Sequence, residues 1–420
     1  MSAEIHIISK KDISKHETVP VNLSLPPLGP SSIRARSSLI SITSNNLSYA
    51  KLGDYLQWWS TWPVPLNAPA PYNNQDEWGI VPAWGFGRVR ESTIDSIPAG
   101  SLLYGCWPTS THAVDLKLQS HEAKGHFVEV SEHRQGLGNI YNRYNIVDET
   151  AKSEEFRAIL ANAFPIWHAG YLINRFNFPT EFKPVHPLGS SGEWTEKDAD
   201  LKSAVVVNLS ASSRTGRSVA WNFTRNRKPN VNGPLALLNA TSSPQTLNHA
   251  HKPAVEVKSV NYDNLVDKET MDWIANFKPN RVVVLDNGGP AETTERFREL
   301  LVDSLPASTA LTLVMVGNVP KIESLEEFQA SMALKARWGH TAQLNTTDVA
   351  DAAIAAEGAD AFCQGVEGAF ERAVAENYLG DIGLVWGSGV GGQAGIEKAW
   401  ENLIKGTLSP TKAWVYQLEN

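Results

Sequence analysis

Alternating strand-like and helix-like segments between residues 204 and 316 constrain the fold more than any other feature of this chain. Segments with helical periodicity, 217–226 and 292–301, lie between short apolar runs. Those runs have the composition of strands buried on both faces, and they cover residues 204–207, 235–238, 255–260, 281–286 and 311–316. Because such alternation needs crossovers between parallel strands, it predicts an α/β fold with a doubly wound parallel sheet.

The chain before this stretch is rich in β-forming residues. Runs 32–42 and 79–89 are broken by turn-forming residues, which predicts a small, curled β-barrel. Residues 55–63 are rich in tryptophan and lead into a Pro- and Asn-rich stretch, which we expect to be a long ordered loop because exposed indole is costly. Residues 120–148 are polar and are expected to be an irregular connection. Residues 348–377 are Ala-rich and strongly helical in pattern.

The composition fits two globular domains. The chain has 420 residues, of which 42% are hydrophobic and 20% charged. A formal net charge of −8 offers no basic surface for a phosphate backbone, so nucleic acid is not an expected partner. Cys106 and Cys363 are too few for a disulfide framework or a zinc site of four thiolates. No apolar run approaches the ~20 residues that span a bilayer, and residues 1–11 lack the zones of a secretory signal, so we expect a cytoplasmic protein.

The strand at 204–207 runs into a turn of small and basic residues and then into a helix. Dinucleotides bind at such a turn because backbone amides and the helix dipole point at the pyrophosphate. Serines replace the glycines of the G-x-G-x-x-G pattern until Gly216, yet hydroxyls and the side chains of Arg214 and Arg217 can also contact phosphate. The expected cofactor-binding residues here are Ser210, Ser212, Ser213, Arg214, Thr215 and Gly216. A polar turn with no ligand is the alternative.

Other candidate cofactor contacts follow the later strands of the predicted sheet. Ser242 and Ser243 come after the second strand, where an Asp or Glu would bind the ribose of NAD. Hydroxyls suit a 2′-phosphate instead, so NADP is the preferred cofactor, although both serines are also common helix caps. Asn287 and Gly288 follow one strand and Gly317 another, at the edge where the nicotinamide riboside would lie. Ordinary strand-ending turns explain these residues equally well.

Several segments together resemble a known family. Residues 45–50 (NNLSYA), 82–89 (PAWGFGRV) and 100–105 (GSLLYG) are similar to the GroES-like half of medium-chain dehydrogenases and reductases. More narrowly, the chain resembles the DUF2855 proteins, an uncharacterised branch related to quinone oxidoreductases. The resemblance extends over nearly the whole chain. Its matching pieces are Asn45 and Asn46 with Tyr49, the Trp-Gly-Phe segment 84–86, Tyr141 with Asn142 and Tyr144, and Ser210 to Ser213 with the basic residue after them.

The resemblance implies a domain order and a reaction. A GroES-like β-barrel domain would cover residues 1–155 and a Rossmann domain residues 156–320, with 321–420 returning to the barrel. The implied reaction transfers a hydride between NADPH and an enone, quinone or ketone, with a polyketide-like compound among the candidate substrates, in a cleft between the domains. Nothing in the chain matches the cysteine-rich zinc lobe of other members, so the resemblance implies metal-free chemistry. Related enzymes commonly pair through an edge of the Rossmann sheet, so a homodimer is compatible with it.

A reductase without zinc must polarise the substrate oxygen with hydrogen-bond donors and reprotonate the product. Tyr49 is the first candidate, because the corresponding barrel position faces the cleft in similar enzymes; Asn46, Tyr144 and His133 are the others. Trp84, Trp59 and Trp62 are candidates for an aromatic substrate wall. Each has a structural alternative: a packed tyrosine, a turn-forming asparagine, solvated loop residues or a tryptophan core.

Two further functional classes stay open. Because the glycines are missing, one alternative is a protein that keeps the fold but performs non-redox acid–base chemistry, such as a dehydratase, a retro-aldol lyase or a hydrolase, with Tyr, His and Asn side chains. A non-catalytic binding protein is the third hypothesis, although a two-domain cleft is not needed for scaffolding alone.

Overall fold

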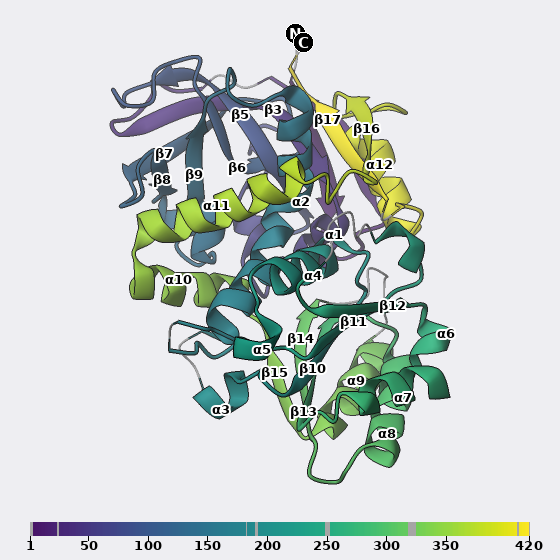
Figure 1. The fold of residues 1–420 in the computed structure, drawn as a ribbon. Coiled ribbons are helices and arrows are strands. Elements are labelled where there is room, and N and C mark those ends of the chain that lie inside the picture. The colour runs from purple at the N-terminus through teal and green to yellow at the C-terminus, as the bar shows by residue number, and fades with distance from the viewer. Residues whose placement is uncertain are drawn as a thin grey trace. The chain divides into compact units, whose positions relative to one another are not determined.

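The computed structural model describes residues 3–22, 25–181, 183–189, 192–247, 253–317, 325–409 and 411–419. The chain divides into two compact units (Figure 1). One unit contains Met1–Pro165 and Ile382–Asn420, and the other contains Ile166–Asp381. We refer to them as the barrel unit and the sheet unit.

The barrel unit is built around six antiparallel strands that close on themselves. In spatial order they are β3 (Ser32–Ile42), β5 (Pro82–Ser92), β6 (Leu102–Pro108), β9 (Arg143–Val147), β8 (His126–Glu129) and β7 (Val114–Ser120), and β7 pairs back to β3. β3 and β5 approach each other closely at Gly85, where a Cβ would lie 2.7 Å from Cα of Ile40. The predicted GroES-like barrel is therefore confirmed, and closure removes the free strand edges that an open sheet would leave.

Further elements extend the barrel. β17 (Lys412–Gln417) pairs antiparallel with β3, and β16 (Gly383–Ser388) pairs parallel with β17. A separate small sheet has the order β2 (His16–Val21), β1 (Ala3–Ser9) and β4 (Trp78–Gly79). The helices of this unit include α1 (Ser44–Lys51) and α12 (Ile396–Ile404), and its short 3-10 turns are η1 (Trp58–Ser60), η2 (Glu132–Arg134) and η3 (Asn139–Asn142).

The sheet unit contains six parallel strands, as the apolar runs predicted. Their spatial order is β12 (Glu256–Val260), β11 (Ala236–Ala240), β10 (Ala204–Leu209), β13 (Arg281–Asn287), β14 (Ala310–Gly317) and β15 (His340–Gln343). Numbered along the chain, this order is 3-2-1-4-5-6, that of a Rossmann fold. The direction of winding reverses between β10 and β13, and ligands bind such sheets outside the carboxyl ends of the strands at that point.

Helices cover both faces of this sheet. Alternate side chains of β10, namely Val205, Val207 and Leu209, pack in one apolar cluster with residues of α6 (Tyr262–Leu265), α7 (Lys268–Asn276) and α8 (Ala291–Ser304). These helices lie together on one side of the sheet, with α9 (Leu325–Lys335) beside them (Figure 1). The other helices in the described part of the chain are α2 (Glu154–Leu172), α3 (Glu196–Ala199), α4 (Arg214–Arg225), α5 (Pro229–Asn232), α10 (Thr346–Glu357) and α11 (Ala359–Ala375). The π-helical segment η4 (Ile173–Asn177) follows α2, and two short 3-10 turns are η5 (Pro244–Thr246) and η6 (Ala336–Trp338).

One local expectation was wrong and another, the helical stretch 348–377, was confirmed. Residues 120–148 are not irregular throughout, because they contain β8 and β9. These two strands pair with each other and complete the barrel, and the side chains of β8 alternate between buried and half-buried. The Ala-rich stretch forms two helices, α10 and α11, separated at Gly358, where φ is +87°. A glycine tolerates this backbone conformation and ends the first helix.

The chain passes back to the barrel unit at residue 382. The resemblance placed the domain boundaries at 155 and 320, whereas the division observed here falls at 165 and 381. β15 lies beyond residue 320 and pairs with β14, and Phe370 of α11 packs edge-on against Trp167 at 5.6 Å, so both elements stay with the sheet unit. No helix in the described part of the chain has the length and apolarity required to cross a membrane.

The stability of the barrel unit should depend on buried histidines. His6 on β1 is fully buried, with Nε2 3.1 Å from Nδ1 of His16, and burial together with the charge of His16 lowers the pKa of His6 to about 3. Burial and the charge of Arg36 lower the pKa of His112 to about 4. Because histidine in an unfolded chain titrates near ~6.5, unfolding takes up protons below that pH. The unfolding free energy should therefore fall as pH decreases from about 6.5 to 4, by up to ~1.4 kcal/mol per pH unit for each histidine.

Urea unfolding between pH 7 and pH 4 of His6→Phe, His112→Phe and the double variant tests this. Each single variant should flatten the pH dependence, and the double variant should flatten it by the sum of the two. A dependence as steep in the double variant as in the native protein would show that His6 and His112 do not cause the acid sensitivity.

Candidate functional site

The turn between β10 and α4 is shaped by two serines and a glycine. Ser213 is the N-cap of α4, and its hydroxyl accepts a hydrogen bond from the Gly216 amide at 3.0 Å. A Cβ at Gly216 would lie 2.6 Å from Cα of Ala211 and closer still to the carbonyl oxygen of Ser210. Only glycine therefore allows the first turn of the helix to approach the end of the strand this closely.

Ser210 has a φ of +52°, a conformation that glycine adopts more easily. Such strain costs ~1 kcal/mol or more in a residue with a side chain. Hydrogen bonds offset it: the Ser210 hydroxyl donates to the carbonyl of Gly288 at 2.9 Å, and its amide donates to the hydroxyl of Tyr262 at 3.0 Å. Ser210 thus links the turn to the loop after β13 and to α6.

The turn presents hydrogen-bond donors at the amino end of a three-turn helix. In the described part of the chain, no group accepts from the amides of Ser212 and Thr215. Arg214 is the first residue of α4; burial and the charge of Arg217 lower its pKa to about 10, so the guanidinium is still a cation at neutral pH. Amide donors, a helix dipole and a cation together suit a bound anion, and a phosphate group fits this donor set.

Arg217 is engaged elsewhere. Its guanidinium forms a two-pronged ion pair with Asp381, at 2.8 Å and 2.6 Å, and its Nε donates to the carbonyl oxygen of Ser212 at 2.9 Å. The side chain is almost fully buried. Arg217 therefore stabilises the turn through these contacts, and its guanidinium is not available to a ligand.

Hydroxyl groups follow the second strand, β11. Thr241 shares a hydrogen bond with Ser212, which joins this loop to the turn. Ser242 is exposed, and Ser243 immediately precedes the short η5 turn, where its carbonyl oxygen accepts from the Thr246 hydroxyl at 2.8 Å. No carboxylate occupies the position where NAD-specific proteins of this fold bind the ribose.

A chain of amide groups crosses the carboxyl ends of three neighbouring strands. Nδ2 of Asn208 on β10 donates to Oδ1 of Asn239 on β11 at 2.8 Å, and Nδ2 of Asn287 on β13 donates to Oδ1 of Asn208 at 2.8 Å. Asn208 Nδ2 also donates to the carbonyl oxygen of Gly216 at 2.9 Å. These buried amides fix the spacing of the strand ends and hold α4 against them.

The loop after β13 lies against the same edge. The amides of Gly288 and Gly289 donate to Oδ1 of Asp286 at 3.0 Å and 2.7 Å, and Lys335 pairs with that carboxylate at 2.9 Å. Gly317 ends β14 opposite Asn287. The structure therefore brings Ser210, Asn287, Gly288 and Gly317 together, although the Asn287 amide nitrogen is committed to the strand ends.

An aromatic cluster in the barrel unit surrounds Tyr49. Nε1 of Trp84 donates to the Tyr49 hydroxyl at 2.9 Å. The ring of Tyr49 packs edge-on against Trp58 at 4.7 Å and against Tyr141 at 5.7 Å, and Trp84 and Tyr141 lie 5.9 Å apart. Burial is the main cause that raises the pKa of both tyrosines well above the usual value, so both hydroxyls keep their protons at neutral pH. We call Tyr49, Trp58, Trp84 and Tyr141 the Tyr49 cluster.

The other candidates from the barrel do not join the Tyr49 cluster through the contacts observed. Asn46 accepts from the Thr43 amide at 2.7 Å and donates to the carbonyl oxygen of Pro82 at 2.9 Å, so both ends of its amide stabilise the start of α1. Tyr144 donates to the carbonyl oxygen of Cys106 at 2.7 Å inside the barrel.

The remaining barrel candidates lie in two other places. Trp62 stacks on Trp107 at 6.4 Å and lies under the guanidinium of Arg134 at 4.1 Å. Trp59 and His133 line a separate pocket.

The defining sequence pattern of the proteins of unknown function named DUF2855 matches residues 40–409. The chain belongs to the DUF2855 family. No curated protein matches its sequence.

Solved structures share the fold of this DUF2855 protein at low sequence identity. The mitochondrial 2-enoyl thioester reductase Etr1p/Etr2p heterodimer of Candida tropicalis is 11% identical, with a TM-score of 0.54 over 99% of this chain and 100% of the other. CurA of Vibrio vulnificus in complex with NADPH is 10% identical, with a TM-score of 0.50 over 96% and 94% of the two chains. CurK enoyl reductase is 11% identical, with a TM-score of 0.51 over 100% of both. At these identities the likeness shows the fold, which is that of medium-chain dehydrogenases and reductases.

Within the described ranges, no group of three or more His, Cys, Asp or Glu side chains could hold a metal ion. The two cysteines, Cys106 and Cys363, are both buried.

The site of this DUF2855 protein includes residues that sequence reasoning missed. Tyr262 follows the third strand of the sheet, so the edge rule that selected Ser242 and Asn287 would also have found it. Asn208 is a polar residue inside a run of buried aliphatic ones, which by itself signals a special role. Tyr141 was noted in the sequence only as part of the resemblance, and its contact with Tyr49 depends on the barrel closing.

The close approach at Gly216 gives a direct test of the turn. Gly216→Ala would push a methyl group into backbone atoms of Ser210 and Ala211, so we expect a loss of about 1 to 3 kcal/mol in the free energy of unfolding. Gly368→Ala is the matched control, because that helical glycine has only the end of Arg372 nearby, at 3.5 Å, and alanine there should stabilise by up to ~1 kcal/mol. Urea unfolding of both variants measures the difference, and equal effects would contradict the packing role of Gly216.

Proposed function

We propose that the protein is a reductase that uses NADPH to reduce an activated carbon–carbon double bond or a carbonyl group, as in an enone, a quinone or a ketone. The observation that carries this proposal is the donor set at the start of α4: the amides of Ser212 and Thr215, with the Arg214 cation beside them, at the switch point of a Rossmann sheet.

Several features favour NADPH over NADH. Ser242 and Ser243 follow β11 where an acidic side chain would bind a ribose hydroxyl, and hydroxyls are compatible with a 2′-phosphate. Among structures of similar fold, CurA was solved with NADPH, and Etr1p with NADP and crotonyl-CoA.

Tyr49 has the properties of a proton donor to the substrate oxygen. NADPH would supply the hydride, and the protein must then hold the substrate and supply the proton. The Tyr49 hydroxyl is protonated; it accepts from Nε1 of Trp84 and shares a hydrogen bond with the Tyr141 hydroxyl, so its proton would turn from Tyr141 to the substrate oxygen. Donation by Trp84 also stabilises negative charge on the phenol oxygen as the proton leaves. Tyr141, within the same cluster, is a second source of a hydroxyl donor.

One observation favours the non-redox alternative, a lyase, dehydratase or hydrolase on the same fold. The amide of Ser210 already donates to Tyr262, and Arg217 is paired with Asp381, so two groups of the turn are used within the protein. A protein that had lost the nucleotide would tolerate such contacts.

Nucleotide affinity separates these hypotheses. We expect calorimetry to show NADPH binding more tightly than NADH, and Arg214→Ala to weaken NADPH by about tenfold or more because a charge-assisted contact is lost. The control Arg296→Ala removes an exposed arginine of α8 and should change neither affinity. Equal weakening of both nucleotides by Arg214→Ala would assign Arg214 to the pyrophosphate, and no binding of either nucleotide would exclude the redox proposal.

The role of Tyr49 is tested by activity. With an enone or quinone that the native protein reduces, Tyr49→Phe should lower kcat by about 100-fold or more while leaving the NADPH affinity unchanged, because general acid catalysis contributes on this scale. Tyr416→Phe is the control, because Tyr416 is a buried tyrosine of β17 outside the Tyr49 cluster. NADPH consumption under steady-state conditions measures kcat, and full activity of Tyr49→Phe would remove this tyrosine from the mechanism.

A further inference from the structure

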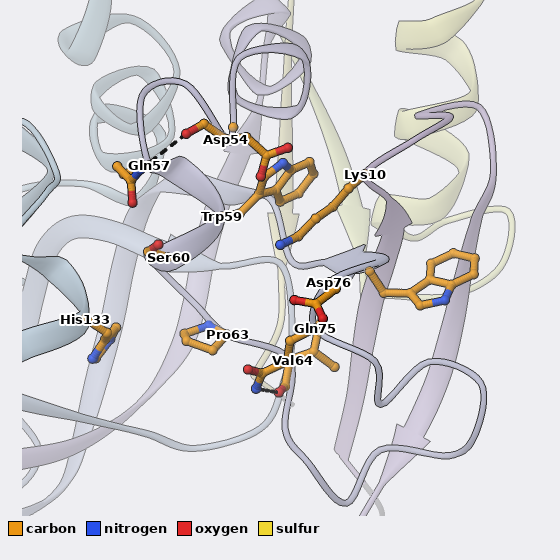
Figure 2. Close-up of a pocket in the computed structure, with 12 residues that line it drawn as sticks. Lys10, Asp54, Gln57, Trp59, Ser60, Pro63, Val64, Gln75, Asp76 and His133 are labelled. Carbon is orange, nitrogen blue, oxygen red and sulfur yellow. Dashed lines mark hydrogen bonds between the residues drawn. The ribbon is translucent and has the colours of Figure 1, made fainter.

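The barrel unit contains a pocket of about 340 Å³ that the proposed reaction does not use. It is formed by the tryptophan-rich segment after α1, by residues near β4, and by Lys10 and His133 (Figure 2). Its volume falls within the range of about 300 to 1,000 Å³ that is usual for small-molecule sites. The pocket and the Tyr49 cluster both involve η1: Trp58 packs on Tyr49, whereas its neighbour Trp59 lines the pocket.

One wall of the pocket is an indole that the fold holds in place. Trp59 is only 6% exposed. A Cβ at Gly53 would lie 2.5 Å from its Cδ1, and a Cβ at Gly79 would lie 2.7 Å from its Cζ3, so both glycines leave room for the ring. A side chain clamped in this way loses no further conformational freedom when a ligand packs on it.

Three charged side chains at the pocket are not paired within the described part of the chain. Asp54, Asp76 and Lys10 line it, and none of their side chains forms an ion pair or a hydrogen bond with the part of the chain that the structure describes. The Lys10 ammonium group lies over Trp59, 5.8 Å from the ring centre. The neighbouring Lys11, in contrast, pairs with Glu77 at 2.9 Å.

Two glutamines are oriented by hydrogen bonds that use only their nitrogen atoms. Nε2 of Gln57 donates to the carbonyl oxygen of Asp54 at 3.3 Å, and Nε2 of Gln75 donates to the carbonyl oxygen of Val64 at 2.6 Å. Their side-chain oxygens are thereby left as acceptors, and Figure 2 shows both side chains at the margin of the pocket. The pocket therefore offers one cationic donor, two carboxylates and two amide oxygens around an aromatic wall.

From this combination we infer a second binding site, for a neutral molecule rich in hydroxyl groups, such as a sugar or a sugar alcohol. An anion would meet two carboxylates, and a simple cation would meet the Lys10 ammonium group. A hydroxyl group satisfies both kinds of partner, because it accepts from lysine and donates to a carboxylate or an amide oxygen. The apolar face of such a molecule packs on indole, which presents both a flat surface and a polar edge.

Binding of neutral and charged probes tests this site. Calorimetry of the full chain with sorbitol, methyl glucoside and trehalose, and with putrescine and citrate as charged comparisons, should show saturable binding of at least one neutral probe and none of the charged ones. Asp76→Asn and Lys10→Met should each weaken that binding by about tenfold, since each removes a hydrogen bond to a charged group. Neither side chain forms an ion pair or a hydrogen bond in the described structure, so neither substitution should disturb folding.

The matched control is Asp303→Asn, which removes an exposed carboxylate of α8 and should leave probe binding unchanged. Preferential binding of putrescine that Asp76→Asn abolishes would overturn the assignment to hydroxyl-rich ligands. Absence of saturable binding by all three neutral probes, or binding that none of the pocket variants weakens, would overturn the site itself.

Discussion

The contact between Gly216 and the backbone of the preceding turn is the constraint on which the candidate nucleotide site depends. Because no side chain fits at residue 216, α4 begins directly against the end of β10, and its free amides gather in one place. Asn208 strengthens the contact by donating to the Gly216 carbonyl oxygen, and Arg217 does so by donating to that of Ser212. A helix that began even one residue further from the sheet would lose this geometry.

Ser210 shows how a turn with few glycines can still form. Glycine would adopt the positive φ without strain but could not bond to its surroundings. Serine carries the strain and recovers stability through Gly288 and Tyr262, which join three loops at the same edge of the sheet. At this position the turn is fixed by side-chain hydrogen bonds rather than by a glycine, and fewer amides are left for a ligand. A nucleotide at this turn would depend more on Arg214 and on Ser212 and Thr215 than the glycine-rich pattern requires.

The sequence was sufficient to predict the fold and the position of the turn between β10 and α4. It did not predict the contacts of the residues around that turn. Runs such as 204–207 and 281–286 identify buried parallel strands because such strands need apolar residues on both faces. The partners of Asn208 could not be inferred, because its contacts with Asn239 and Asn287 depend on the register of β10 with both neighbouring strands. The closing strands β8 and β9 are short and half polar, so their pattern resembles a loop.

The tryptophan-rich segment is a second case in which the sequence predicts an element but not the contacts of its side chains. Its composition predicted an ordered loop, but composition cannot assign individual indoles to surfaces. In the short turn η1, Trp58 packs on Tyr49 whereas Trp59 is clamped between Gly53 and Gly79. The side chains of these consecutive residues thus pack in different places, because the turn points successive side chains in different directions. One three-residue element therefore fixes both the Tyr49 cluster and the wall of the pocket, which makes η1 the part of the barrel unit where a change in sequence would affect both.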